Sequence, residues 1–269
     1  MTEQQMTEKF NEGKDFFDKK NNEEAFSIFK ELSDLGYANA QFMMGICCAG
    51  GLGAEKSDVK AAQWFRKAAD QGNASAQNEL GVFYQLGAGV EKNFEKAVEL
   101  YSLAAVQGNL EAIGHLAFCN QHGLGIEKDH ENAAELYRKA AEAGHISSQY
   151  QLGLCYHKGE GVQQDFEKAA DWYYKAAKEG DRWAQFHLGI CYYHGEGVEQ
   201  DFAKAVEVFK ASAYLGLDEA QYHLGVCVLN GQGTERNLDI AAGLLQMAAK
   251  QGHTEAQNVL NELEKRGII

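Results

Sequence analysis

DRWAQFHLGICYYHGEGVEQDFAKAVEVFKASAYLG, residues 181–216, is the segment from which the fold can be predicted, because its pattern recurs every 36 residues. The glycine that closes it stands at the same place in every copy: Gly36, Gly72, Gly108, Gly144, Gly180, Gly216 and Gly252. A fixed period of this length is typical of repeat architectures, in which each repeat is one supersecondary unit. We therefore expect the 269 residues to form one continuous array.

Each copy predicts two helices separated by a pair of glycines. The first half carries the pattern A-Q-x-x-L-G-x-C-Y, whose spacings of three and four indicate one buried helical face, and it ends at Gly195 and Gly197. A good helix N-cap follows the glycine pair in all six copies: Ser57, Asn93, Asp129, Asp165, Asp201 and Asn237. The second half has all-alanine columns beside a bulky column, and the closing glycine fits the left-handed C′ position of a helix. We call the two halves helix A and helix B.

The two ends of the chain differ from the repeat. Residues 1–35 lack the glycine-pair insertion but keep the spacing of a tetratricopeptide hairpin, which predicts an N-terminal capping hairpin. Residues 253–269 supply one more helix A with a polar outer face, which predicts a C-terminal capping helix.

With these motifs, residues 37–260 closely resemble the Sel-one-like repeat (SLR) family, relatives of the tetratricopeptide repeat with a longer hairpin loop. The resemblance implies six such repeats over residues 36–252, an all-α, right-handed α/α superhelical solenoid, and an adaptor role in protein complexes. Ile113, Ala117 and Asn120 depart from the motif in the third full repeat. A cysteine-rich branch of the family, associated with penicillin binding, resembles this chain poorly because its second cysteine, on helix B, is absent here.

Composition limits the partners. A net charge of −14 argues against nucleic acid or an anionic membrane surface, since both require clustered cations. No apolar run approaches the length of a membrane span, and the start MTEQQMTEKF does not resemble a secretory signal, so a cytoplasmic location is expected. Five of the six cysteines occupy one column of the repeat, where neighbours are too far apart for disulfides, so reduced thiols are expected.

Motifs for catalysis or for a cofactor are not evident. The two S-x-x-K strings, at Ser27 and Ser57, lack the companion motifs of β-lactamases, and the glycine pairs lack the third glycine of a nucleotide fingerprint. A zinc site of His187, His194 and His223 is disfavoured, because ligands about 10 Å apart do not converge on one ion. We expect a protein that is not an enzyme and has neither cofactor nor metal.

Variable columns of helix A form one stripe opposite the buried face, which is the concave surface of a tetratricopeptide-like superhelix. Aromatic residues and histidines gather on it in the C-terminal half, and they are the candidate partner-binding residues: Tyr150, His157, Trp183, Phe186, His187, Tyr193, His194, Tyr222 and His223. The alternative is that the aromatic residues of this stripe pack against the adjacent helix A.

The function predicted from these observations is a non-enzymatic scaffold that binds a protein or peptide in the concave groove. Two alternatives stay open: a binder of carbohydrate or cell-wall fragments, and an enzyme of the penicillin-binding or β-lactamase type. The sequence does not determine the oligomeric state.

Overall fold

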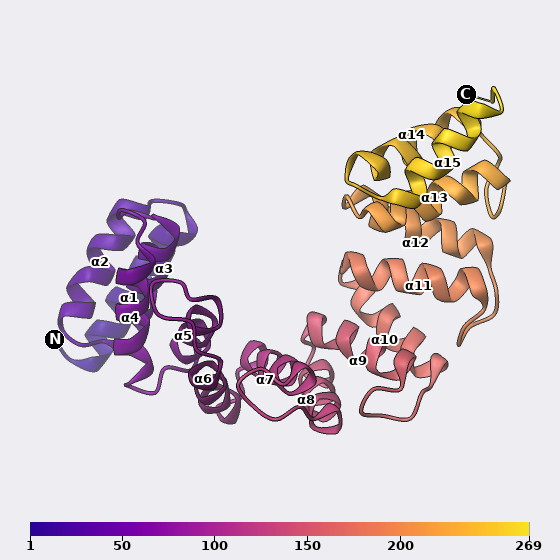
Figure 1. Ribbon diagram of the computed structural model, residues 1–269. Coiled ribbons are helices and arrows are strands. Elements are labelled where there is room, and N and C mark those ends of the chain that lie inside the picture. Colours follow the sequence, from indigo (N-terminus) through magenta and orange to yellow (C-terminus); the bar gives the residue numbers. More distant parts are fainter. Residues whose placement is uncertain (269) are drawn as a thin grey trace. The chain divides into compact units, whose positions relative to one another are not determined.

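The computed structural model describes residues 1–268, which form fifteen α-helices and no strand (Figure 1). Ile269, the last residue of the expected C-terminal cap, lies outside the described residues. The chain divides into two compact units, Met1–Leu136 and Tyr137–Ile269, with the boundary inside α8. The helices are α1 Glu3–Asp18, α2 Asn22–Asp34, α3 Ala38–Gly50, α4 Asp58–Ala69, α5 Ala74–Leu86, α6 Phe94–Val106, α7 Leu110–His122, α8 His130–Glu142, α9 Ile146–Lys158, α10 Phe166–Lys178, α11 Arg182–His194, α12 Phe202–Tyr214, α13 Asp218–Asn230, α14 Leu238–Lys250 and α15 Thr254–Lys265.

Each unit is a stack of helical hairpins, as the 36-residue pattern predicts. Helices A and B of one repeat pack against each other, as in α11 with α12, and helix B packs against the next helix A, as in α12 with α13. The predicted N-caps are confirmed: in all six, the side-chain oxygen accepts a hydrogen bond of 2.8–3.3 Å from the backbone N–H three residues later. The all-α fold predicted from the sequence is therefore confirmed.

Glycine is required at the predicted turn positions for two different reasons. The closing glycines all have φ between 85° and 100°, the left-handed conformation expected after a helix C-cap. Gly197, the second glycine of its pair, has φ 72°, and a Cβ there would also overlap the backbone carbonyl of Phe166 at the start of the preceding helix B. The glycine pair thus allows each loop to pass close to the neighbouring repeat.

The core of each hairpin combines small and large side chains. In the repeat of α11 and α12, Ala205 and Phe209 are fully buried, and a Cβ at Gly189 would approach the ring of Phe209 to 2.5 Å. The glycine of the L-G pair therefore makes room for the bulky ring of helix B. This close packing of helix A on helix B fixes which face of each helix remains accessible.

The first hairpin, α1 and α2, has no glycine pair in its loop. Lys20, with φ 62°, supplies the left-handed residue that the loop needs, and Thr2 and Gln5 form a capping box at the start of α1. At the other end, α15 buries Leu260 and Leu263 and leaves most of its other residues exposed.

The three departures in the third full repeat are accommodated inside the core. Ile113, Ala117 and Asn120 are all buried. The Asn120 amide donates to the Leu116 carbonyl at 2.9 Å, and its side-chain oxygen accepts from Asn132 at 3.0 Å. Both polar ends of this buried side chain are hydrogen-bonded, so its burial carries no large penalty.

Candidate functional site

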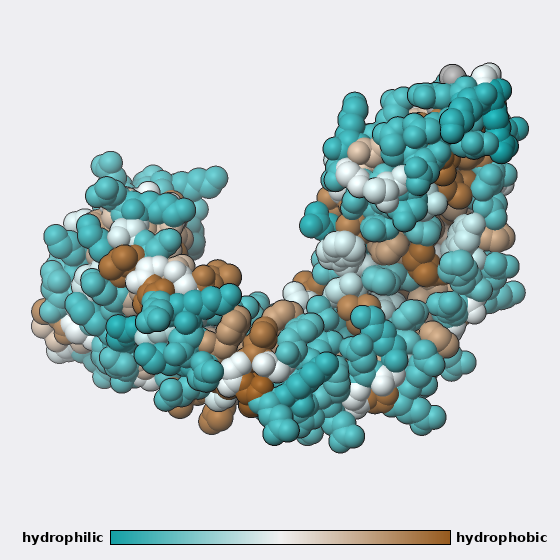
Figure 2. All heavy atoms as spheres, viewed as in Figure 1, coloured by the Kyte–Doolittle hydropathy of each residue, from teal (hydrophilic) through white to brown (hydrophobic). Residues whose placement is uncertain are grey.

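The candidate partner-binding residues all lie in the unit that begins at Tyr137, on the A helices α9, α11 and α13. Trp183 stands at the start of α11 and is 38% exposed, and His194 is exposed at the end of the same helix. Eleven residues apart on one helix, these two side chains face the same side. We call the surface formed by Tyr150, Trp183, Tyr193, His194 and Tyr222 the helix-A face. Figure 2 shows that the visible surface is largely hydrophilic, with scattered hydrophobic patches.

Phe186 is buried and is not accessible on this face, whereas His187 and His223 are half-buried against neighbouring aromatic rings. Phe186 is only 8% exposed and packs in a core cluster with Phe209, 6.0 Å between ring centroids. His187 stacks on Tyr173 of the preceding helix B at 5.3 Å, and His223 stacks on Phe209 at 5.5 Å. The two histidines stack on B helices, and only the contact between Phe186 and His223 of the next helix A, 5.4 Å between ring centroids, is of the kind raised as the alternative from the sequence.

Burial also changes the protonation of these two histidines. The charged imidazolium loses hydration inside the stack, and this desolvation lowers the pKa of His187 to about 4 and that of His223 to about 4. Electrostatic interaction with a neighbouring histidine adds to the effect: with His157 for His187 and with His253 for His223. Both side chains are therefore neutral at physiological pH.

His157 and Tyr193 join neighbouring repeats. The Nε2 atom of His157 lies 3.2 Å from the Glu196 carboxylate, and the Tyr193 hydroxyl donates to the Gln232 side-chain oxygen at 3.1 Å. Glu196 and Gln232 are the middle residues of successive glycine pairs, so both contacts tie the end of a helix A to the loop of the next repeat. These contacts therefore hold in place the helices that carry the helix-A face, to which Tyr193 itself belongs.

Tyr150 and Tyr222 are half-buried at the edges of the face. The Tyr150 ring lies 5.7 Å from that of His187, and burial raises the pKa of its phenol to about 12. Tyr222 stacks on His253 at 4.5 Å, and His253 Nε2 lies 3.2 Å from the Glu219 carboxylate. The face is thus a surface of partly exposed aromatic rings with polar tips.

Groups for metal or thiol chemistry are not assembled in the described part of the chain. Residues 1–268 contain no cluster of three side chains placed to hold a metal ion. The six cysteines are free and buried, and burial raises the pKa of the Cys191 thiol to about 12 and that of the Cys119 thiol to about 11. Thiols held in this state are poor nucleophiles.

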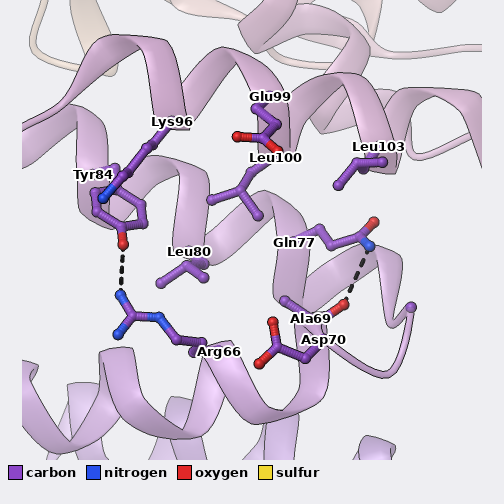
Figure 3. Close-up of a pocket in the computed structure, with 11 residues that line it drawn as sticks. Arg66, Ala69, Asp70, Gln77, Leu80, Tyr84, Lys96, Glu99, Leu100 and Leu103 are labelled. Carbon is purple, nitrogen blue, oxygen red and sulfur yellow. Dashed lines mark hydrogen bonds between the residues drawn. The ribbon is translucent and has the colours of Figure 1, made fainter.

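A pocket that the sequence reasoning missed lies in the other unit, between α4, α5 and α6 (Figure 3). Its volume is about 430 Å³, and its wall includes Arg66 from α4, Tyr84 from α5 and Lys96 from α6. The Arg66 guanidinium donates to the Tyr84 hydroxyl at 2.6 Å. The sequence carried only a weak signal, in an adjoining cavity that shares Arg66, Tyr84 and Lys96: Asn93 lines that cavity, whereas the three following repeats have aspartate at this position.

Comparison with known proteins agrees with this architecture. The Sel1 repeat family model matches residues 38–73, 74–109, 110–145, 146–181, 184–217 and 218–253. The chain belongs to the Sel1 repeat family. It is therefore an α-solenoid, and proteins of this family are generally non-catalytic scaffolds for protein interaction.

Solved structures of Sel1 repeat proteins are similar over most of the chain. A Sel1 repeat protein from Oxalobacter formigenes is 33% identical, with a TM-score of 0.82, over 89% of this chain and 96% of that one. A protective antigen present in uropathogenic Escherichia coli strains, with an SLR fold, is 32% identical with a TM-score of 0.86. That match covers 97% of this Sel1 repeat chain and 57% of the antigen.

More distant likeness extends to the fold alone. Yeast Tom70 is 16% identical with a TM-score of 0.55, over 91% of this chain and 50% of that one. No match was found among curated proteins. No helix in residues 1–268 combines the length and apolar character needed to cross a membrane.

Proposed function

We propose that this Sel1 repeat protein is a non-enzymatic scaffold and that a protein or peptide partner binds on its helix-A face. The observation that supports the proposal is the partial exposure of Trp183, a large aromatic side chain, on the helix α11. Exposed aromatic residues with polar tips are the residue types that dominate binding energy at protein interfaces.

The hydrogen bonds between repeats make this face well suited to binding. His157 with Glu196, and Tyr193 with Gln232, hold α9 and α11 to the loops that follow them. A surface that is already ordered loses little conformational entropy when a partner binds. Family membership supports the same function, and the six free, buried cysteines fit a proposed cytoplasmic location.

Photo-crosslinking tests the location of the partner. A photo-reactive phenylalanine analogue is placed at residue 183 of the full chain, and in a matched control at Tyr174, which is exposed on α10, a B helix. After irradiation in the source organism, we expect discrete protein adducts from position 183 and none from position 174. Adducts from position 174 alone would show that the partner binds the opposite side of the hairpins.

Truncation tests the energetic role of the exposed residues. The double variant Trp183→Ala/His194→Ala should weaken binding of the crosslinked partner by about 2 kcal/mol or more, as expected for interface hot spots. Both side chains are exposed, so the circular dichroism spectrum should be unchanged. His223 is unsuitable for this test, because its ring packs on Phe209 and its loss would disturb folding. Unchanged affinity of the double variant would contradict the proposal.

A further inference from the structure

Two cationic side chains lie over one tyrosine ring in the unit Met1–Leu136, and a third lies over a phenylalanine ring nearby. The Arg66 guanidinium carbon lies 5.8 Å from the centroid of the Tyr84 ring, and Lys96 Nζ lies 5.3 Å from it. Lys92 Nζ lies 4.8 Å from the ring of Phe94 nearby. Attraction between each cation and the negative face of a ring holds the charged groups in place while all three remain exposed.

These groups line two adjoining cavities. The first, of about 430 Å³, continues from Arg66 and Lys96 along the apolar side chains of Leu80 and Leu100 (Figure 3). The second, of about 600 Å³, shares Arg66, Tyr84 and Lys96 and adds Lys92. Three cations and one carboxylate, that of Glu91, line this second cavity, so its charge is positive in a chain whose net charge is −14.

Comparison with later repeats of the same chain shows what is different about this pocket. Lys168 and Lys204, the equivalents of Lys96, lie over Tyr156 and Tyr192 at 5.4 and 5.5 Å. Each of these two lysines forms an ion pair with the aspartate that caps its helix: Lys168 with Asp165 at 2.9 Å, and Lys204 with Asp201 at 3.4 Å.

The cap before Lys96 is Asn93, which accepts the same backbone hydrogen bond but carries no charge. The hydrogen bond of Arg66 likewise goes to a neutral group, the Tyr84 hydroxyl. The positive charge that later repeats neutralise internally is therefore available here to an anionic ligand. An arginine with further N–H donors beside a lysine is a typical arrangement for binding carboxylate or phosphate.

The acidic side chains of the first cavity limit the kind of ligand. Asp70 and Glu99 line this cavity together with Leu80 and Leu100, and Leu103 lies on the side away from Arg66 and Lys96 (Figure 3). A polyanion such as a nucleic acid would be repelled by these carboxylates and by the negative chain as a whole. A peptide with one acidic group beside an apolar side chain matches both the charges and the apolar floor.

We propose that the pocket of Arg66, Tyr84, Lys92 and Lys96 binds an acidic peptide segment of a partner protein. A carboxylate or phosphate of the peptide interacts with Arg66 and Lys96, and a neighbouring apolar side chain packs on Leu80 and Leu100. This site belongs to a different unit from the helix-A face and is formed largely by B helices. It would give the scaffold a second, independent binding surface.

Selection from a random heptapeptide library on the full-length protein, followed by fluorescence anisotropy with the best labelled peptide, tests the proposal. We expect enrichment of Asp or Glu next to an apolar residue, and weaker binding as salt rises, since exposed charges are screened. Arg66→Gln/Lys96→Gln should weaken the affinity at least tenfold. Asn93→Asp should weaken it several-fold, because it introduces the neutralising carboxylate found at Asp165 while remaining a good N-cap.

The matched control is Arg138→Gln/Lys168→Gln, which removes the equivalent pair two repeats later and should leave binding unchanged. Replacing the acidic residue of the peptide with phosphoserine distinguishes the two anions, and tighter binding of either one supports the site. The proposal is overturned if no acidic sequences are enriched, or if the selected peptide binds Arg66→Gln/Lys96→Gln and wild type equally. Retained binding by Trp183→Ala/His194→Ala is expected, and it separates this site from the helix-A face.

Discussion

The stacked histidines of helix A have a structural role that depends on their neutral form. His187 covers Tyr173, and His223 covers Phe209, each ring belonging to the preceding helix B. His115 occupies the same position over Tyr101 in the other unit, at 4.9 Å. An imidazole can stack flat on an aromatic ring and still present a polar edge, which suits the junction between two repeats.

Acidification should destabilise the fold through these residues. Because the pKa of His187 and of His223 is lowered to about 4 in the fold, the unfolded chain binds more protons than the folded one between that value and the ordinary value near 6.5. The neutral histidines contribute fully to the free energy of unfolding above pH 6.5, the pKa of histidine in the unfolded chain. As pH falls from there to about 4, that contribution is lost, on the order of 1 kcal/mol per histidine. Urea unfolding at about pH 7.5 and about pH 5 measures it.

The control for this pH effect is His187→Gln/His223→Gln, since Gln151 occupies the same position in the preceding repeat. The double variant should show a smaller fall in unfolding free energy over the same pH range. A fall equal to that of wild type would assign the pH dependence to other groups.

Two glycines should respond differently to the same substitution. Gly180→Ala introduces a side chain at φ 91° with no atom within 4 Å of it. Only the strained backbone conformation should therefore lower the free energy of unfolding, by about 1 kcal/mol. Gly197→Ala adds the overlap with the Phe166 carbonyl and should destabilise by a larger amount. Urea unfolding of the two variants ranks them, and the reverse order would contradict the close approach of loop and helix.

At the scale of single elements, the B helices have side-chain N-caps, but one of them contains a glycine in its interior. The helix α14 contains Gly243, which has an ordinary helical conformation, and no atom lies within 4 Å of the position that a Cβ would take there. A glycine at this position lowers helix stability without making room for a neighbour, unlike Gly189 beneath Phe209.

Gly243→Ala should therefore stabilise the protein by about 1 kcal/mol, because alanine is the better helix former and nothing obstructs its methyl group. A thermal melt followed by circular dichroism should show a higher midpoint. Gly189→Ala is the contrasting variant and should lower the midpoint, since its methyl group would displace the Phe209 ring. A lower midpoint for Gly243→Ala would contradict its assignment to an unobstructed helical position.

At the scale of the whole molecule, repeats within one unit present nearly identical surfaces to each other. The sequence AQFHLG at residues 184–189 of α11 corresponds to AQYHLG at residues 220–225 of α13. Both helices place a histidine on the ring of the preceding helix B. The stability of such an array is approximately the sum of the stability of each repeat and of the interfaces between neighbouring repeats.

Deletion of residues 181–216 should leave a helical protein that unfolds cooperatively, because α13 would then pack on α10 through the same side chains as α11. Circular dichroism and urea unfolding test this expectation. Deletion of residues 181–198, half a repeat, is the control and should disrupt the fold, since it leaves a helix B without its helix A. Similar behaviour of the two deletions would contradict the repeat architecture.

The repeat, its hairpins, their N-caps and their closing glycines could all be predicted from the amino-acid sequence. These features depend on local backbone requirements: Asp165 and Asn237 cap a helix wherever it occurs, and Gly180 permits a positive φ whatever surrounds it. A period of 36 residues repeats the same local information, so the sequence needs no long-range contact to specify the element order.

The accessibility of individual side chains, in contrast, became evident only from the packing of the repeats. Helical periodicity places Phe186 and Trp183 on helix A, but the neighbouring repeat covers the first ring and leaves the second 38% exposed. The pocket of Arg66, Tyr84 and Lys96 likewise exists because three consecutive helices bring these residues together. Periodicity along one helix indicates the direction in which each side chain points. The exposure of that side chain depends on what packs against it from elsewhere in the chain.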